Sequence, residues 1–320
     1  MSRAKNSVVH NQEQSQARVS PRLLPPVPAL ISRSPEDAIA EKQRREQKDA
    51  LVRGVTSIQE VREAIRRVGR NIPAISAVPR ISMLDAATFR TRAVEGLPFV
   101  ITGLVSRWPL SALTPQMLHD RYGDLRVRAR VGDYVNKAFA PDRAMQDMSM
   151  IEYLDLVSTG TQDLPPYIGN LELRELNRMC YWPAYFGKMG PPRFWLGPSG
   201  TVTPLHCDYD DNIFAQIWGT KRIFLSPPHH DEFLYTSEAN AVLFGSPVNP
   251  EAPDFEKFPL ARQASMIECI VNPGELLYLP AGWYHHVRSL TFSLSANRWA
   301  RALPLALNGD PSLQRMRLSD

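Results

Sequence analysis

The sequence predicts a mainly β protein with flanking helices, whose core is a sandwich or jelly-roll barrel. From residue 191 onward, short apolar or alternating stretches follow one another, separated by turns rich in glycine and proline. Many short strands joined by such turns are typical of these folds. Upstream, helical patterns alternate with a few strand patterns. The chain has 320 residues, of which 43% are apolar and 22% charged, an ordinary composition for a globular protein.

The first 75 residues are expected to lie outside this core. Residues 1–33 combine Gln, Ser, Asn and Pro without a sustained period, which predicts a disordered leader. Residues 34–75 predict a basic helical extension, in which Ser34-Pro35 and a Ser57/Glu60 capping box each begin a helical pattern. Residues 1–70 hold 14 Lys and Arg against 8 Asp and Glu. This charge is compatible with an anionic partner, but a solvated surface is the favoured interpretation.

Strand and helix patterns alternate between residues 76 and 190. Residues 79–83 predict a first strand, residues 85–94 a capped helix and residues 98–103 a buried strand. Two further helices are expected over residues 114–123 and 149–160. Residues 125–131 alternate apolar residues with Arg126, Arg128 and Arg130, which predicts a half-buried strand with an exposed basic outer face.

The β-rich part is expected to contain strands over residues 193–196, 201–208, 213–218, 221–225, 266–271, 275–279 and 289–297. Gly219-Thr220 separates two of these strands and predicts a tight hairpin. Residues 76–302 are therefore expected to form one domain, followed by a C-terminal tail over residues 303–320.

The sequence also suggests where the protein acts. Its start is polar and lacks a secretory signal, and no apolar run approaches membrane-spanning length. Three widely spaced cysteines argue for reduced thiols, and against a disulfide framework or a thiolate zinc site. We therefore expect a cytoplasmic protein that contacts no membrane and has no nucleic-acid partner.

The chemistry is expected to centre on His206 and Asp208. Alternate residues of a strand point to the same face, so these two side chains converge, and Asn212 shares their face. Non-haem iron oxygenases hold their metal with two histidines and one carboxylate. His285 follows a strand, a Pro-Gly turn and an aromatic pair, a setting that can hold it rigidly over a cavity. Each of these residues alone is more often structural than catalytic.

Four motifs extend this pattern in order along the chain: Thr203-x-x-His206-x-Asp208-x-x-x-Asn212, Gly219-x-Lys221-Arg222, Pro273-Gly274-Glu275-x-Leu277-Tyr278-x-Pro280 and Trp283-x-His285-His286. With them the chain resembles the JmjC, cupin-like iron(II)/2-oxoglutarate-dependent oxygenases. Within this family it is similar to the hydroxylases typified by the asparaginyl hydroxylase of hypoxia-inducible factor. The resemblance covers residues 78–300, implies a double-stranded β-helix core, and makes residues 76–302 the catalytic domain.

The resemblance also implies the roles of individual residues. Iron(II) would be bound by His206, Asp208 and His285. The cosubstrates would be O2 and 2-oxoglutarate. Binding of 2-oxoglutarate would use a salt bridge from Lys221 and hydrogen bonds from Thr203, Asn212, Asn297 and Tyr167.

Strand alternation supports part of this assignment. Lys221 shares a face with apolar residues, and a lysine there is costly unless an anion pairs with it. Polar residues alternate along the last strand up to Asn297, so its polar face would line the cavity. Thr203 breaks the alternation because it lies three positions from His206. Pro204 is expected to mark a bulge that turns it inward.

The implied reaction is hydroxylation of a side chain of a peptide or protein, with decarboxylation of 2-oxoglutarate to succinate. Two alternatives stay open: hydroxylation of a small metabolite or natural-product precursor peptide, and a non-catalytic cupin-like binding protein. We hypothesise that Asp210 or Asp211, next to the ligand pair, favours a basic substrate group by charge pairing. Assembly of the chain into a homodimer is a further open alternative.

Overall fold

The computed structural model describes residues 63, 66, 69–70, 72–82, 85–140, 142–160, 164–187, 189–208, 210–240 and 243–300. The expected leader (1–33), most of the expected helical extension (34–75) and the expected tail (303–320) lie outside the described residues. These domain assignments therefore stay predictions.

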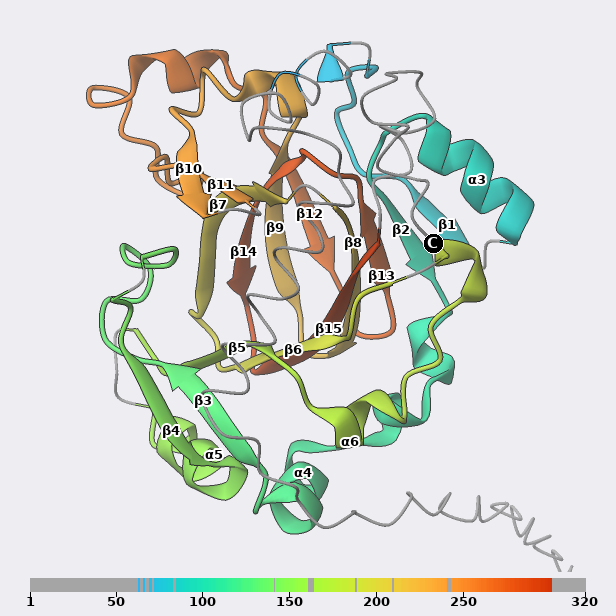
Figure 1. The fold of residues 1–320 in the computed structure, drawn as a ribbon, viewed down its shortest axis with the longest axis vertical. Coiled ribbons are helices and arrows are strands. Elements are labelled where there is room, and N and C mark those ends of the chain that lie inside the picture. The colour runs from blue at the N-terminus through green and yellow to red at the C-terminus, as the bar shows by residue number, and fades with distance from the viewer. Residues whose placement is uncertain are drawn as a thin grey trace, which may run out of the picture.

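Two facing β-sheets form the jelly-roll core that the sequence predicts (Figure 1). The nine-stranded sheet has the order β1 (Arg80–Ser82), β2 (Phe99–Thr102), β13 (Leu276–Leu279), β8 (Asp211–Trp218), β15 (Ser293–Ala300), β6 (Arg193–Gly197), β5 (Tyr167–Leu171), β3 (Arg126–Arg130) and β4 (Met145–Ser149). The six-stranded sheet has the order β10 (Ser237–Asn240), β11 (Leu243–Gly245), β7 (Val202–Asp208), β14 (Tyr284–Ser289), β9 (Lys221–Ser226) and β12 (Ile267–Val271). All pairs are antiparallel except β1 with β2.

The helices flank the nine-stranded sheet, and α3, α4 and α5 begin where the sequence places their caps. They are α3 (Ala86–Val94), α4 (Pro115–Tyr122), α5 (Met150–Ser158) and α6 (Arg174–Asn177), with 3-10 turns η1 (Val105–Arg107), η2 (Pro109–Ala112), η3 (Ala184–Phe186), η4 (Pro228–His230) and η5 (Pro259–Gln263). Asp85 and Thr114 each accept a backbone N–H at their N-cap, and both arms of the Ser149/Glu152 capping box form. Within the described ranges, no helix combines the length and apolar character needed to cross a bilayer.

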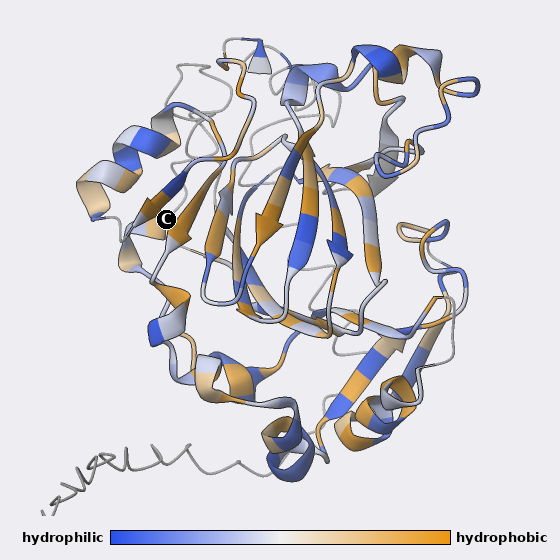
Figure 2. Cartoon of the chain, turned by 180° about the vertical axis from the view of Figure 1, so that it is seen from behind, coloured by the Kyte–Doolittle hydropathy of each residue, from blue (hydrophilic) through white to orange (hydrophobic). Residues whose placement is uncertain are grey.

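Apolar packing on opposite faces of the sheets holds this architecture together. The largest cluster lies under the helices, on one face of the nine-stranded sheet, and includes Phe89 and Trp108. A second cluster around Phe244 covers the outer face of the six-stranded sheet, and a third, around Ile223 and Trp283, lies between the sheets. Figure 2 shows the resulting alternation of apolar and polar residues, for example along β3. Full burial of each large apolar side chain contributes roughly 1.5–3 kcal/mol.

Gly219-Thr220 joins β8 to β9, but the two strands do not form the predicted hairpin. β8 pairs with β13 and β15, whereas β9 pairs with β12 and β14 in the other sheet. The link therefore crosses between the sheets. Gly219 has φ 70°, and a Cβ at this position would lie 2.2 Å from the Phe292 carbonyl oxygen. The hairpin prediction is wrong because a short turn signal does not specify which sheet the next strand joins.

The sequence predicts one closing strand over residues 289–297, whereas the structure has two strands, β14 and β15, over residues 284–300. β14 lies between β7 and β9, and its Tyr284-His285-His286 segment is entirely buried. A strand buried on both faces carries no alternating pattern, so periodicity does not reveal it. Four shorter strands, β4, β5, β10 and β11, are likewise absent from the predicted set.

The crossover at Gly219 leads to a prediction about stability. Gly219→Ala should lower the free energy of unfolding by about 3 kcal/mol or more, because the methyl group adds a backbone clash to the strain of a positive φ. Gly200→Ala is the matched control: Gly200 has φ 90°, but a Cβ there meets nothing within 4 Å. It should cost only about 1–2 kcal/mol. Denaturant unfolding measures both values, and equal losses would contradict the crowding assigned to the crossover.

Candidate metal centre and adjoining cavity

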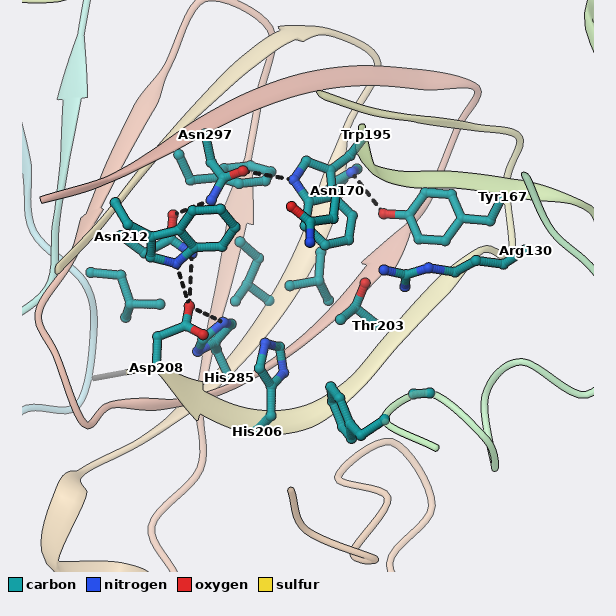
Figure 3. Close-up of a pocket in the computed structure, with 18 of the residues that line it drawn as sticks. Arg130, Tyr167, Asn170, Trp195, Thr203, His206, Asp208, Asn212, His285 and Asn297 are labelled. Atoms are coloured by element: carbon teal, nitrogen blue, oxygen red, sulfur yellow. Dashed lines mark hydrogen bonds and ion pairs between the residues drawn. The ribbon is translucent and has the colours of Figure 1, made fainter. Parts of the chain in front are cut away.

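Strands β7 and β14 bring the three predicted metal ligands together (Figure 3). His206 and Asp208 lie on one face of β7, and His285 lies opposite His206 in the register of β14. The three side chains are buried, and each offers a ligand atom within 4.8 Å of the others. The imidazole rings of His206 and His285 have centroids 4.1 Å apart. The strand pairing thus creates a compact cluster of two imidazoles and one carboxylate.

Backbone carbonyl groups orient both histidine rings. Nδ1 of His206 lies 2.7 Å from the Pro204 carbonyl oxygen, and Nδ1 of His285 lies 3.0 Å from the Trp283 carbonyl oxygen. A carbonyl oxygen only accepts, so each Nδ1 carries the proton and donates it. This tautomer leaves the lone pair on each Nε2, which is the arrangement of a histidine prepared for a metal.

Side chains from the nine-stranded sheet orient the carboxylate of Asp208. Its Oδ2 accepts a hydrogen bond from Trp299 Nε1 at 2.8 Å and another from Asn212 Nδ2 at 3.3 Å. Burial raises the pKa of Asp208, while nearby His285 and these two bonds favour the ionised form. Both bonds go to Oδ2, so Oδ1 has no hydrogen bond to the described residues and can serve as a ligand.

The electrostatics of the cluster fit a divalent cation. Burial is the main cause that lowers the pKa of His206 and His285, so both rings stay neutral and can act as ligands. A bound cation would also stabilise the charged form of the buried Asp208 carboxylate. Two neutral imidazoles and one carboxylate are the donor set of the facial triad that holds non-haem iron(II).

A cavity of about 590 Å³ opens beside the cluster, a size in the range of small-molecule sites. Its walls come from the inner faces of both sheets and from residues 138–140 and 143. All five residues that the sequence associates with 2-oxoglutarate lie in this wall: Lys221, Asn212, Thr203, Asn297 and Tyr167. The structure therefore brings the predicted site residues into one space, and their roles are taken up below.

Lys221 projects from β9 into this cavity and is only 1% exposed. Its Nζ donates to Ser295 Oγ at 2.8 Å and to the Tyr167 hydroxyl at 3.5 Å, and both partners are neutral. Burial, and next the charge of Arg130, lower the pKa of Lys221 to about 7. An anion in the cavity would reverse this effect by stabilising the ammonium form.

A β-bulge turns Thr203 into the cavity, as the sequence predicts. His206 pairs with His285 and Thr203 pairs with Val287, so three residue steps on β7 oppose two on β14. The extra residue rotates the strand by one face. Thr203 therefore lines the cavity on the same side as His206, near the Tyr167 hydroxyl.

The two predicted asparagines belong to a chain of hydrogen bonds that reaches the carboxylate of Asp208. Trp195 Nε1 donates to Asn297 Oδ1 at 2.8 Å, and Asn297 Nδ2 donates to Asn212 Oδ1 at 3.0 Å. Asn212 in turn donates to Asp208, so both amides fix the position of a ligand. Trp195 and Trp299 are not among the site residues predicted from the sequence. Trp299 continues the alternation of β15 beyond Asn297, so strand parity was a sufficient signal for it.

The prediction that the arginines of β3 form an exposed basic face is wrong for Arg130. Arg126 and Arg128 are exposed as expected, but Arg130 is only 5% exposed and lines the cavity. Arg130 pairs with Tyr167 on β5, and Gly169 of that strand leaves room for it, since a Cβ there would lie 2.9 Å from Arg130 Cζ. No pattern within β3 separates Arg130 from its neighbours, because its burial depends on a distant strand.

Asp211 and Asp210 do not have the position that a basic substrate group would require. Asp211 is fully buried outside the cavity, where its Oδ2 accepts from the Tyr278 hydroxyl at 2.7 Å and its Oδ1 from Ala281 N at 2.9 Å. Asp210 is half-buried and does not line the cavity either. Asp211 braces the turn that leads into β14, so the hypothesis of a basic substrate paired with this residue is wrong.

The sequence is similar to a known domain family and to several curated proteins. The family described as cupin-like domain matches residues 85–304. The chain is 32% identical over 218 residues to the lysine-specific demethylase JMJ30 of Arabidopsis thaliana, covering 64% of this chain and 50% of that protein. It is 30% identical over 233 residues to lysine-specific demethylase 8 of Xenopus tropicalis, covering 70% and 53%. It is 34% identical over 158 residues to the human bifunctional peptidase and (3S)-lysyl hydroxylase JMJD7, covering 43% and 49%. The chain thus spans about half the length of these relatives.

The hydrogen bond from Trp299 to Asp208 gives a test of the metal site. Trp299→Phe keeps an aromatic ring at this position but removes the indole N–H that donates to Asp208. It should weaken binding of manganese(II) or iron(II) by about 10- to 100-fold. Trp218→Phe is the matched control, because Trp218 Nε1 has no hydrogen-bond partner among the described residues. Anaerobic calorimetric titration measures both affinities. A Trp299→Phe protein that binds metal as tightly as the native protein would contradict this role.

Proposed function

Because the chain belongs to the cupin-like, JmjC-type family, we propose that it is an iron(II)- and 2-oxoglutarate-dependent oxygenase that hydroxylates a side chain of a peptide or protein. The observation that carries the proposal is the placement of a His-Asp-His cluster and a buried lysine in the wall of one cavity. The family resemblance expected from the sequence is confirmed. The closer similarity to the asparaginyl hydroxylase stays a prediction, as do the cytoplasmic location and the homodimer.

His206, Asp208 and His285 would hold the iron. When bound, iron(II) with O2 and 2-oxoglutarate supplies the oxidant for C–H hydroxylation, and 2-oxoglutarate leaves as succinate and CO2. The protein contributes the orientation of its ligands: the carbonyl groups of Pro204 and Trp283 hold the rings, and Trp299 holds the carboxylate. Three protein ligands would leave coordination positions open to the cosubstrates.

The buried charge of Lys221 would hold the far carboxylate of 2-oxoglutarate. Tyr167 and Ser295 already contact its Nζ, and Thr203 contacts Tyr167, so hydroxyl donors surround the place where an anion would bind. Apolar residues of both sheets, including Ile223 and Leu277, also line the cavity and suit the methylene groups of a short dicarboxylate. Asn212 and Asn297 would act mainly by positioning Asp208.

The segment between β3 and β4 would limit access of water to the metal. Phe139 of this segment lies with its ring centroid 5.2 Å from that of His206, and Ala138 and Ala140 line the cavity beside it. Apolar groups next to the ligands keep bulk water from the site, which protects a reactive centre from side reactions.

The names of the relatives support a protein side chain as the substrate. They include lysine-specific demethylases and a (3S)-lysyl hydroxylase, so the group that these names specify is an amino-acid side chain. Lysine itself is not carried over to this chain, because its cavity is lined by three cationic side chains and one carboxylate. Hydroxylation of a metabolite and binding without turnover are the alternatives that the following experiments separate.

The first experiment measures succinate formed from 2-oxoglutarate by the purified chain with iron(II) in air. We expect succinate to depend on iron and to fall more than about 100-fold in His206→Ala, since the metal loses a ligand. His119→Ala is the control, because His119 lies on α4 and contacts Asp120 and Asp155 away from the cavity. Absence of iron-dependent succinate in the native protein would leave a binding protein as the better interpretation. Mass spectrometry of cell-extract proteins and metabolites for an added oxygen atom separates a protein substrate from a metabolite.

The second experiment uses the titration of Lys221. Its pKa is lowered to about 7, so raising the pH from about 7 to about 9 removes the charge that binds a carboxylate. The affinity for 2-oxoglutarate, measured without O2 in the presence of iron(II), should therefore fall roughly tenfold per pH unit above pH 7. In Lys221→Arg the guanidinium keeps its proton, and any remaining affinity should be nearly flat over this range. An equally steep decline in both proteins would show that another group is responsible.

A further inference from the structure

The cavity carries more positive charge than the proposed cosubstrate accounts for. Arg130, Arg143 and Lys221 line it, whereas Asp208 is the one carboxylate among its lining residues. A divalent metal and Lys221 would together be neutralised by Asp208 and the two carboxylates of 2-oxoglutarate. Arg130 and Arg143 would then still lack a counter-charge.

Arg130 is buried without an anionic partner. It is 5% exposed, its Nε has no hydrogen-bond partner, and no ion pair joins it to a carboxylate in the described part of the chain. Its guanidinium lies over two rings, 5.1 Å from the centroid of Trp195 and 5.5 Å from that of Tyr167. Figure 3 shows the group pointing into the cavity between Tyr167 and Thr203. Contacts with aromatic faces only partly replace the water that a buried cation loses.

Arg143 adds a second guanidinium to the same cavity. It lies between β3 and β4, is half-buried, donates to the Ala138 carbonyl oxygen, and leaves its Nε without a partner. Burial, and next the charge of Arg143, lower the pKa of Arg130 to about 10, so both arginines remain charged at neutral pH. Two cations that repel one another in a buried wall are stabilised together by one anion.

The position of Arg130 is built into the neighbouring strand. A Cβ at Gly169 of β5 would lie 2.9 Å from Arg130 Cζ and from the Trp195 ring, so only a glycine leaves this space free. Arg128, two residues earlier on β3, instead forms a salt bridge at 2.6 Å with Asp147 on the surface. Of these two arginines, the exposed Arg128 thus has a carboxylate partner, whereas the buried Arg130 has none among the described residues.

We propose that Arg130 and Arg143 form a substrate subsite for a carboxylate, so that the chain binds an acidic segment of a peptide or protein, with an Asp or Glu side chain at these two guanidinium groups. The subsite lies across Tyr167 from Lys221 and shares the cavity with the metal ligands. A planar guanidinium matches a carboxylate through two parallel hydrogen bonds, which gives direction as well as charge. The inference rests on the proposed oxygenase function and adds the class of substrate to it.

The test measures peptide binding without turnover. The full chain is loaded with iron(II) and saturating 2-oxoglutarate in the absence of O2, and then offered three pools of short peptides of equal length. The pools differ at one central position, which is Asp or Glu, Asn or Gln, or Lys or Arg. Mass spectrometry of the retained peptides reports the preference. We expect the native chain to retain the acidic pool about tenfold more than the amide pool, and the basic pool least.

Three variants test whether Arg130 and Arg143 cause the preference for acidic peptides. Arg130→Met should remove most of it, and Arg143→Met, a change in a half-buried connecting segment, should reduce it even if Arg130→Met fails to fold. Arg128→Met is the matched control and should keep the native preference, because Arg128 pairs with Asp147 on the surface. Equal retention of the acidic and amide pools by the native chain would overturn the inference, as would an unchanged preference in both the Arg130 and Arg143 variants.

Two further outcomes separate this inference from the function on which it rests. If the native chain neither binds 2-oxoglutarate nor forms succinate with iron(II), the oxygenase proposal fails and the subsite fails with it. If it binds 2-oxoglutarate but shows no acidic preference, only the subsite fails. If Arg130→Met raises the dissociation constant for 2-oxoglutarate measured without peptide about tenfold or more, Arg130 serves the cosubstrate and the inference is overturned.

Discussion

The pairing of β7 with β14 is the constraint on which the site depends. It places His285 opposite His206, and the bulge between His206 and Thr203 turns both ends of β7 toward the same cavity. Side chains alternate along a strand, so a shift of one residue in this register would move the ligands to the outer face of the sheet. Packing of the outer face around Leu205, Cys207 and Phe244 opposes such a shift. The geometry of the metal site is therefore maintained by apolar burial on the far side of the same strand.

The nine-stranded sheet completes the site from the other side. β8 and β15 supply Asn212, Asn297 and Trp299, which hold Asp208, and Ser295, which contacts Lys221. The strands that carry the ligands thus differ from the strands that orient the carboxylate. The site therefore requires both sheets, because Asp208 lies on one sheet and its hydrogen-bond donors Asn212 and Trp299 lie on the other. Within the cavity wall the cationic side chains outnumber the acidic ones, so anions are the ligands that its electrostatics favour.

Neighbouring residues in β8 illustrate how one strand serves both structure and chemistry. Asn212 faces the cavity, whereas Asp211 points to the opposite face and bonds Tyr278 and the backbone of Ala281. Ala281 lies just before β14, so Asp211 supports the segment that presents His285. The two neighbours are separated by the alternation of β8 itself, in which successive side chains point to opposite faces.

The family resemblance implied the His206-Asp208-His285 cluster. The sequence by itself determined the shared face of His206 and Asp208, the inward position of Lys221, the inward turn of Thr203 and the helix caps at Asp85, Thr114 and Ser149. Each of these depends on local chemistry: alternation along a strand, the backbone limits of proline, or a side chain that reaches its own backbone. Only the tertiary structure decided that Gly219 crosses between sheets, that β14 lies between β7 and β9, and that Arg130 is buried while Arg128 is exposed. These features depend on which distant strand becomes the neighbour. Hydrogen bonding between strands is satisfied by any partner in the right register, so the choice is made by the packing of the whole core.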